Sequence, residues 1–225
     1  MLIRSASGLR GIAKDHFTPE LIDKYISAFI NTQNIKSCVI GRDGRPSGKQ
    51  TALWVIDSLH KKGVNIDNCG LATTPTMQIM TEKENYDGGI VITASHNPSE
   101  YNGLKFLQND GTFLSPEQCE ELFKAVDQNI SVENSESLGV VSDYSTANKE
   151  HIHKVLSAKC IDVESVIQKK FTVVIDAVNG AGSYILPTLC EQLGCKVITI
   201  NCNGDGNFTR IPEPLAENLQ SLEKK

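Results

Sequence analysis

The chain lacks any apolar stretch that approaches the ~18 residues of a membrane-spanning helix. Polar residues appear by Ser5, which argues against a secretory signal peptide at this end. The seven cysteines are an odd number, are scattered and form no C-x-x-C pair, so neither a disulfide framework nor a common zinc motif is indicated. Together these absences predict a cytoplasmic protein whose thiols are reduced and buried.

Positive charge is also scarce, since 22 Lys and Arg face 27 Asp and Glu and the net charge is −5. Nucleic acids bind to basic surfaces, so they are not expected as partners. With 225 residues and 40% hydrophobic residues, the chain can form a real core, as one large domain or one and a half average ones.

Helix and strand patterns alternate along the chain. Thr18-Pro19-Glu20 has the residue types of a helix start, and an apolar stripe at helical spacing follows it to Ile30. Further helices are predicted near 49–62, 75–83, 115–126, 148–158 and up to 193, and strands at 38–41, within 64–71, at 88–92, 104–107, 171–176 and 195–200.

Residues 128–142 are polar and are the best linker candidate, although Gly139-Val140-Val141 could form a strand. This segment predicts a first domain at residues 1–142 and a second at 143–225.

The most informative segment is Thr93-Ala94-Ser95-His96-Asn97-Pro98, which follows the buried strand predicted at 88–92. Loops at the carboxyl ends of parallel strands are where open α/β sheets place their chemistry. A serine hydroxyl needs activation before it acts as a nucleophile. Neighbouring residues of an extended backbone point to opposite faces, so a Ser95–His96 dyad is not expected, and the G-x-S-x-G elbow of hydrolases is absent.

This loop resembles the active-site loop of the α-D-phosphohexomutases, in which the serine is phosphorylated. Other segments resemble motifs of that family in the same order, namely Ser7–Gly11, Gly41–Arg45, Tyr101–Phe106, Asp176–Gly182 and Pro212–Leu219. The resemblance covers nearly the whole chain. It implies a mixed, mostly parallel sheet between helices, followed by an incomplete second α/β domain.

The resemblance also implies roles for five residues. Ser95 would carry the phosphoryl group, Lys105 of Y-N-G-x-K would be the favoured base, and His96 would lie in the site as a second acid/base candidate. Arg10 would act in catalysis through its charge, and it would also bind substrate together with Asn97 and Lys105. Arginine suits phosphate because its planar fork binds two oxygens, and the flanking Gly8 and Gly11 would let the backbone approach a ligand.

Arg4, Arg42 and Arg45 also lie in the first 45 residues, which suggests a local concentration of positive charge for an anionic ligand. The segment 44–50 is too short for a phosphate-binding P-loop, and Gln50 replaces the required Ser or Thr, so nucleotide binding there is rejected. Asn179–Gly182 opens a helix and could hold an anion, but close strand–helix packing is favoured. His151 and His153 are expected at the surface.

A phosphoserine calls for a cation, and Mg²⁺ is the implied cofactor, bound through the phosphate on Ser95. In the family three aspartates of a D-G-D-G-D-R loop hold the ion. Asn203–Asn207 offers only Asp205, and it precedes Pro212–Leu219, whereas the family's metal loop follows that segment. Asp205 is therefore interpreted as a turn residue, and the metal loop is expected beyond Lys225.

The implied function is that of a phosphohexomutase. Phospho-Ser95 would give its phosphoryl group to a hexose 1- or 6-phosphate of glucosamine, mannose or glucose, and a hexose 1,6-bisphosphate would be the intermediate. Without the metal loop and the later domains, the chain alone is expected to be inactive. Two alternatives stay open: a phosphosugar-binding module without turnover, and a phosphatase in which water takes the phosphoryl group from Ser95.

Overall fold

The computed structural model describes residues 2–6, 8–83 and 86–223. Within them a first sheet contains β1 (Ile3–Ser5), β2 (Gly8–Ile12), β3 (Ser37–Arg42), β4 (Asn65–Leu71), β5 (Gly88–Ile92), β6 (Tyr101–Gln108) and β7 (Val141–Asp143). Their spatial order is β1-β2-β6-β5-β3-β4-β7. A second sheet pairs β8 (Thr172–Asp176) with β9 (Lys196–Ile200) in parallel.

The first sheet is mixed, as the sequence predicts. Strands β5, β3, β4 and β7 pair in parallel. Strand β6 runs antiparallel to both β5 and β2, and β1 runs antiparallel to β2. Strand β2 therefore has the direction of β5, and most strands of the sheet point the same way.

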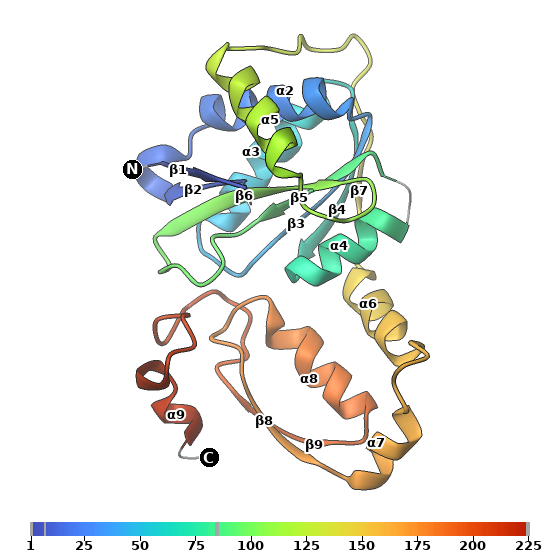
Figure 1. The fold of residues 1–225 in the computed structure, drawn as a ribbon. Helices are drawn as coiled ribbons and strands as arrows, with labels where there is room; N and C mark the ends of the chain where they lie inside the picture. Colours follow the sequence, from blue (N-terminus) through green and yellow to red (C-terminus); the bar gives the residue numbers. More distant parts are fainter. Residues whose placement is uncertain (1, 7, 84–85, 224–225) are drawn as a thin grey trace.

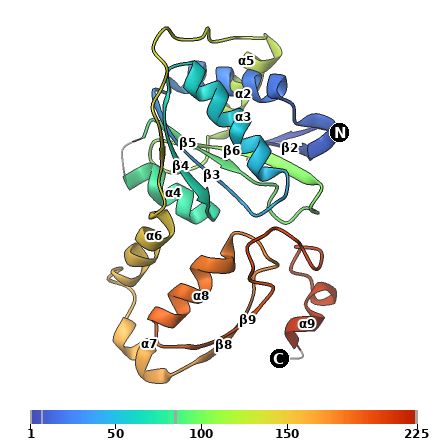
Figure 2. The same ribbon diagram turned by 180° about the vertical axis from the view of Figure 1, so that it is seen from behind.

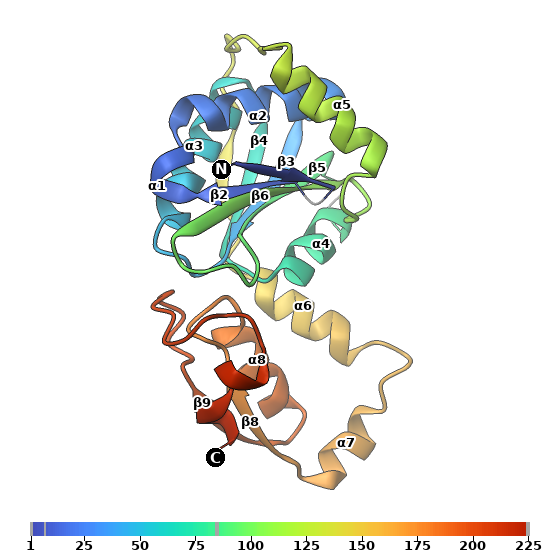
Figure 3. The same ribbon diagram turned by 60° about the vertical axis from the view of Figure 1, so that its left-hand side comes forward.

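Helices cover both faces of the first sheet (Figures 1 and 3). On one face lie α2 (Pro19–Gln33), α3 (Gly48–Lys61) and α5 (Pro116–Asp127), and on the other lies α4 (Thr74–Lys83). Helix α6 (Ala147–Leu156) packs beside α4 and leads toward the second sheet. Alternation along β3 explains the two layers, since Cys38 and Ile40 belong to the core under α2, α3 and α5, whereas Val39 belongs to the core under α4.

Local sequence signals fix the helix starts. The Thr18 hydroxyl accepts a hydrogen bond of 3.2 Å from the Leu21 N–H, and Pro19 is the first residue of α2. At α5, Ser115 and Gln118 form a reciprocal capping box. Both predicted starts are confirmed. The prediction for His151 is wrong: it is half-buried, and its Nδ1 lies 2.9 Å from the Thr76 hydroxyl oxygen, whereas His153 is exposed.

The second sheet is packed against α8 (Gly182–Gln192), and the short helices α7 (Val163–Lys169), α9 (Gln220–Glu223) and η1 (Ala216–Asn218) complete this part. The sequence did not predict α7. The predicted boundary between residues 142 and 143 falls inside β7, and the division into two domains stays a prediction. For brevity, residues up to 143 are called the first unit and residues 144–223 the second unit.

All seven cysteines are free, as predicted, but burial is confirmed only for Cys38, Cys69 and Cys119, whereas Cys190, Cys195 and Cys202 are half-buried and Cys160 is exposed. Thiols on the second unit have less core to occupy. Among the described residues, no helix combines the length and apolar character that a bilayer span requires.

We expect limited proteolysis to cut the second unit first. Apart from Ala147 and Ile152 of α6, its buried apolar residues are few, namely Ile175, Val178 and Ile185, while Phe171 and Tyr184 are 51% and 55% exposed. Few buried contacts allow local opening at low free-energy cost. Mass spectrometry of the digest should find a resistant fragment ending near residue 142. In an Ile40→Ala variant, whose cavity costs ~2–5 kcal/mol, that fragment should become sensitive. Equal cleavage of both units in the unaltered chain would contradict the expectation.

Candidate functional site

The serine loop, residues 93–100, leaves the carboxyl end of β5 and lies beside the loop that follows β3. Ser95 is exposed and has φ of +57°, in the left-handed region that few non-glycine residues adopt. Such a conformation costs on the order of 1–3 kcal/mol and persists only where surrounding contacts enforce it. Two local bonds contribute, from the Ser95 N–H to the Thr93 hydroxyl (3.0 Å) and from the Asn97 N–H to the Ala94 carbonyl (3.2 Å).

Arg45 supplies the main restraint on this loop. Its side chain is fully buried, and its guanidinium donates to the carbonyls of Ser95 (2.8 Å), Asn97 (2.7 Å) and Tyr101 (3.1 Å), and also to that of Pro98. Because all of these acceptors belong to residues 95–101, one side chain shapes the loop from beneath. The expectation that Arg45 adds positive charge for a ligand is therefore wrong.

Asp43 completes this network. Its carboxylate accepts from Arg45 Nε (3.0 Å), from the Arg45 backbone N–H (3.0 Å) and from the Thr93 hydroxyl (2.6 Å). The carboxylate thus balances the buried guanidinium and connects the end of β3 to the end of β5.

A first hollow, of about 180 Å³, brings together four of the predicted residues. Arg10, Ser95, His96 and Lys105 all line it. The sheet explains the grouping, because β6 lies between β2 and β5, so that Arg10 pairs with Gly103 and Lys105 pairs with Val91.

The electrostatics of this hollow favour an anion that accepts hydrogen bonds. Partial burial lowers the pKa of Lys105, and the nearby positive charge of Arg10 lowers it further. Arg10 Nε is buried and has no hydrogen-bond partner among the described residues. A donor in that state costs free energy unless a ligand or water accepts from it.

Asn97 is placed differently. Its side-chain amide donates to the Ala94 carbonyl (2.7 Å), and its own carbonyl accepts from Arg45 (2.7 Å). The structure gives this residue contacts within the loop, and its role as a substrate ligand stays a prediction.

Arg4 and Arg42 do not extend the positive charge of the site either. Arg4 bonds to Tyr25 (2.7 Å) and Asp127 (2.9 Å), and Arg42 donates to the Asp43 carbonyl (2.9 Å). Of the four arginines in the first 45 residues, Arg10 alone lines the hollow of the serine loop as far as the structure describes the chain.

A second hollow, of about 310 Å³, opens on the other side of the loop. Its walls come from both units and include Ser95 and His96 of the first and Val178, Phe208 and Pro212 of the second. Figures 1 and 2 show the second unit lying beneath this part of the first sheet. The serine loop therefore forms the partition between a hollow of the first unit and one at the junction.

The segment 203–208 fits against this junction. Asp205 accepts from the Asn207 N–H (2.9 Å), so its predicted place in a turn is confirmed. Gly206 has φ of +74°, and a Cβ there would lie 1.6 Å from the Gly44 carbonyl oxygen, so only glycine allows the two backbones to approach this closely. The Phe208 ring lies under Arg45, with its centroid 5.2 Å from the guanidinium carbon.

The loop 179–182 supports this segment from the second unit. Asn179 is buried, donates to the Asn207 carbonyl (2.9 Å) and accepts from the Asn203 N–H (2.9 Å). Its polar side chain thus holds the turn in place, a role that a glycine-rich pattern does not disclose.

One contact to His96 also escaped sequence reasoning. Its Nε2 lies 3.2 Å from an Oε2 oxygen of Glu213, which belongs to the second unit. No sequence signal links two residues so far apart in the chain.

Comparison with known proteins decides the family. Residues 1–133 match the family model "Phosphoglucomutase/phosphomannomutase, alpha/beta/alpha domain I", and residues 149–225 match the model of domain II. The chain belongs to the phosphoglucomutase/phosphomannomutase family.

Curated relatives agree with this assignment. A probable phosphoglucosamine mutase of Methanopyrus kandleri is 35% identical over 217 residues, which are 96% of this chain and 47% of that protein. A phosphoglucomutase/phosphomannomutase of Thermococcus kodakarensis is 38% identical over 228 residues, 96% of this chain and 48% of that protein. The chain thus spans about half the length of the curated relatives that it matches.

Solved structures show the same fold. A phosphoglucomutase/phosphomannomutase family protein from Burkholderia thailandensis has a TM-score of 0.77 at 25% identity, over 97% of this chain and 49% of that one. A putative phosphomannomutase from Thermus thermophilus has a TM-score of 0.81 at 21% identity, over 98% of this chain and 51% of that one.

In the part of the chain that the structure describes, no three His, Cys, Asp or Glu side chains lie close enough together to bind a metal ion. Near Ser95, the Asp43 carboxylate is engaged by Arg45 and Thr93, and Glu213 is engaged by His96. These residues do not fit a Mg²⁺ site on their own.

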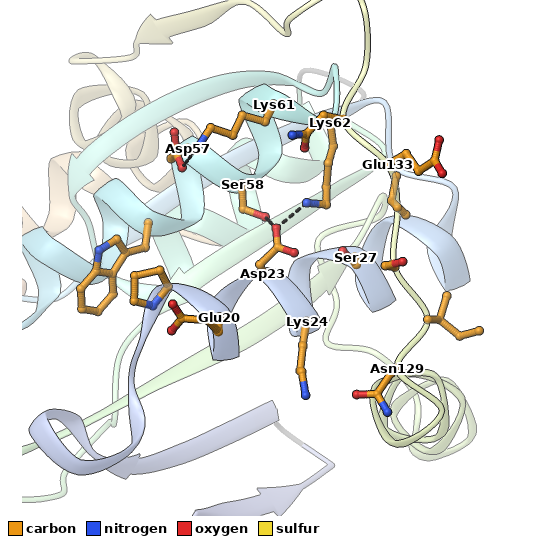
Figure 4. Close-up of a pocket in the computed structure, with 16 residues that line it drawn as sticks. Glu20, Asp23, Lys24, Ser27, Asp57, Ser58, Lys61, Lys62, Asn129 and Glu133 are labelled. Carbon is orange, nitrogen blue, oxygen red and sulfur yellow. Dashed lines mark hydrogen bonds and ion pairs between the residues drawn. The ribbon is translucent and has the colours of Figure 1, made fainter.

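A larger hollow of this chain, of about 700 Å³, lies between α2, α3 and residues 129–134 (Figure 4). There Asp23 accepts from Ser58 (2.7 Å) and Lys62, and Figure 4 shows both bonds. The Lys62 side chain is only 3% exposed, and Lys61 pairs with Asp57 at 2.7 Å. None of the predicted site residues lines this hollow.

Arg45→Gln should destabilise the serine loop far more than Arg4→Gln does. The first change leaves Asp43 and several carbonyls without their buried cation, and breaking a buried pair costs ~3–5 kcal/mol. The second removes a partly exposed pair worth about 0–1 kcal/mol. Urea unfolding should measure the difference, and hydrogen exchange should show faster opening of residues 93–101 in Arg45→Gln. Equal effects of the two variants would mean that Arg45 does not restrain the loop.

Removal of the positive charge at Arg10 should raise the pKa of Lys105, while burial should still keep it below that of an exposed lysine. An NMR titration of the Lys105 side chain in an Arg10→Met variant checks the direction. Arg4→Met is the matched control, because Arg4 contacts Tyr25 and Asp127 instead, and it should leave the Lys105 titration unchanged. A Lys105 pKa that does not rise in Arg10→Met would show that the two charges do not interact.

Proposed function

We propose that this chain carries the phosphoryl-transfer loop of a phosphohexomutase, with Ser95 as the phosphoryl carrier. The observation that carries the proposal is the placement of an exposed, conformationally restrained Ser95 in one hollow with Arg10, Lys105 and His96. Family membership adds to it. The proposed substrates are the 1- and 6-phosphates of glucosamine, mannose or glucose, with a hexose 1,6-bisphosphate as intermediate.

In the proposed first transfer, the bond between phosphorus and Ser95 Oγ breaks while a bond forms between phosphorus and a sugar hydroxyl oxygen. Lys105, in its neutral form, takes the sugar hydroxyl proton, while Ser95 Oγ gains a proton from a second acid, for which His96 is the candidate. In the second transfer that base takes the Ser95 hydroxyl proton, and Lys105 returns its proton to the sugar oxygen that leaves phosphorus. The lowered pKa of Lys105 supports this role, because a larger fraction of the amine is then neutral at a given pH. The bisphosphate turns over, and Ser95 Oγ takes the other phosphoryl group.

Arg10 lines the hollow and would bind the phosphoryl oxygens, because its planar guanidinium can offer two donors. Such a reaction depends on positioning and charge stabilisation more than on covalent chemistry by the protein. The buried Arg45 contributes indirectly, since it fixes the loop that holds Ser95.

Mg²⁺ remains part of the proposal, with the phosphate on Ser95 as one ligand. When bound, it would neutralise charge on the transferred group. Among the described residues, no group of three His, Cys, Asp or Glu side chains offers further ligands. A cytoplasmic location is likewise proposed.

Ser95→Ala should abolish phosphoryl uptake by the protein at its full natural length, because the covalent route requires that hydroxyl. The test is incubation with glucose 1,6-bisphosphate and Mg²⁺, followed by peptide mass spectrometry. The unaltered protein at its full natural length and its Ser99→Ala variant, a change at another exposed serine of the same loop, should both gain phosphate on Ser95. Phosphate on Ser99 instead, or uptake by Ser95→Ala, would contradict the assignment.

The same experiment separates the alternative activity. The exposure of Ser95 to water favours a phosphatase as the second candidate. Steady release of inorganic phosphate by the protein at its full natural length, without isomerised hexose phosphate, would favour it over the mutase.

A further inference from the structure

Three contacts connect residues 203–213 of the second unit to the serine loop and the loop beneath it. Gly206 approaches the Gly44 carbonyl, Phe208 lies under Arg45, and Glu213 meets His96. The first two hold backbone and buried charge in place. The third reaches a side chain that lines both hollows beside Ser95.

The contact to His96 has a defined chemistry. Glu213 Oε2 lies 3.2 Å from His96 Nε2, and because an ionised carboxylate can only accept a hydrogen bond, this placement favours the form of the ring with its proton on Nε2. The other ring nitrogen, Nδ1, then remains for proton exchange with a ligand. A fixed tautomer and ring orientation are what a carboxylate partner gives a histidine that acts as acid or base.

The backbone around Glu213 is itself restrained. Pro212 and Pro214 flank it and limit its conformations. Its carbonyl accepts from the Asn218 side chain (2.9 Å) and from the Leu215 N–H (2.9 Å). The carboxylate is therefore presented from a rigid turn.

Stability is a poor explanation for this pair. The His96 and Glu213 side chains are 55% and 36% exposed, and exposed ion pairs contribute only about 0–1 kcal/mol. A contact that adds little to the free energy of folding, yet restrains a ring beside Ser95, fits a role in the reaction better than a role in the fold.

We propose that Glu213 is a positioning residue for His96: it holds the ring with its proton on Nε2 and leaves Nδ1 for proton exchange beside Ser95. This inference rests on the proposed function. Because Glu213 and His96 belong to different units, the tautomer of His96 depends on how the second unit is seated on the first. Proton transfer at the serine loop is thereby coupled to the position of the second unit relative to the first.

The first test is spectroscopic and needs no turnover. Long-range ¹H–¹⁵N NMR of the chain should show His96, when neutral, as the Nε2–H tautomer. Glu213→Ala should give a mixture of tautomers. Glu213→Gln keeps an acceptor oxygen and should retain the tautomer, and Glu217→Ala, a change at an exposed residue of the same segment, should have no effect. A His96 spectrum in Glu213→Ala identical to that of the unaltered chain would overturn the proposal.

The second test uses the protein at its full natural length and measures the rate at which Ser95 gains phosphate from glucose 1,6-bisphosphate with Mg²⁺. Glu213→Ala should slow it by less than the ~10²–10⁴-fold that a general acid or base supplies, while thermal unfolding stays close to that of Glu217→Ala. In a His96→Ala background, Glu213→Ala should have no further effect. An additive loss in the double variant would overturn a role through His96. If Ser95 takes up no phosphate in any variant, the proposed function fails, and the NMR result alone then decides the role of Glu213.

Discussion

The rest of the site depends on the hydrogen bonds that the buried Arg45 guanidinium donates. A fully buried cation requires partners on every side, and here they are one carboxylate and several carbonyls of a single loop. The arrangement makes the loop conformation and the satisfaction of the charge mutually dependent. The left-handed backbone of Ser95 is retained because relaxing it would withdraw an acceptor from a buried donor.

The same cation connects the levels of the structure. The guanidinium is bonded to Asp43 at the end of β3, and Asp43 accepts a hydrogen bond from Thr93 at the end of β5. The Phe208 ring of the second unit lies under the same guanidinium. The parallel pairing of β3 with β5 is what sets these strand ends side by side. The contacts of this one side chain therefore depend on the sheet topology, on the shape of the serine loop and on the position of the second unit.

Local signals made much of the fold predictable. The cap at Thr18, the serine and glutamine around Pro116, and the apolar runs of β3 and β5 each act within a few residues, so a single sequence contains the whole cause. The pairing of β1 with β2 was missed because that segment is short, polar and glycine-rich. The helix α7 has no buried residue, so it shows no apolar stripe to find.

The candidate site was predictable to the extent that motifs mark it. Arg10, His96 and Lys105 meet at Ser95 because β6 joins β2 to β5, which the motifs alone could suggest but not place. Long-range burial was out of reach: nothing in Gly-Arg-Asp-Gly-Arg distinguishes the buried Arg45 from the half-buried Arg42. The partner of His96 is more than a hundred positions away, where no periodicity can connect the two.

The close approach of Gly206 to Gly44 has a consequence for the ligands that the junction can admit. Where two backbones touch without side chains between them, the distance between the units is set by the main chain itself and cannot be adjusted by changing a rotamer. The Gly206–Gly44 contact thus fixes the distance between the two units beside the 310 Å³ hollow. A side chain at Gly206 would push the two units apart and widen the hollow. The size of the molecule that fits against Ser95 would then change.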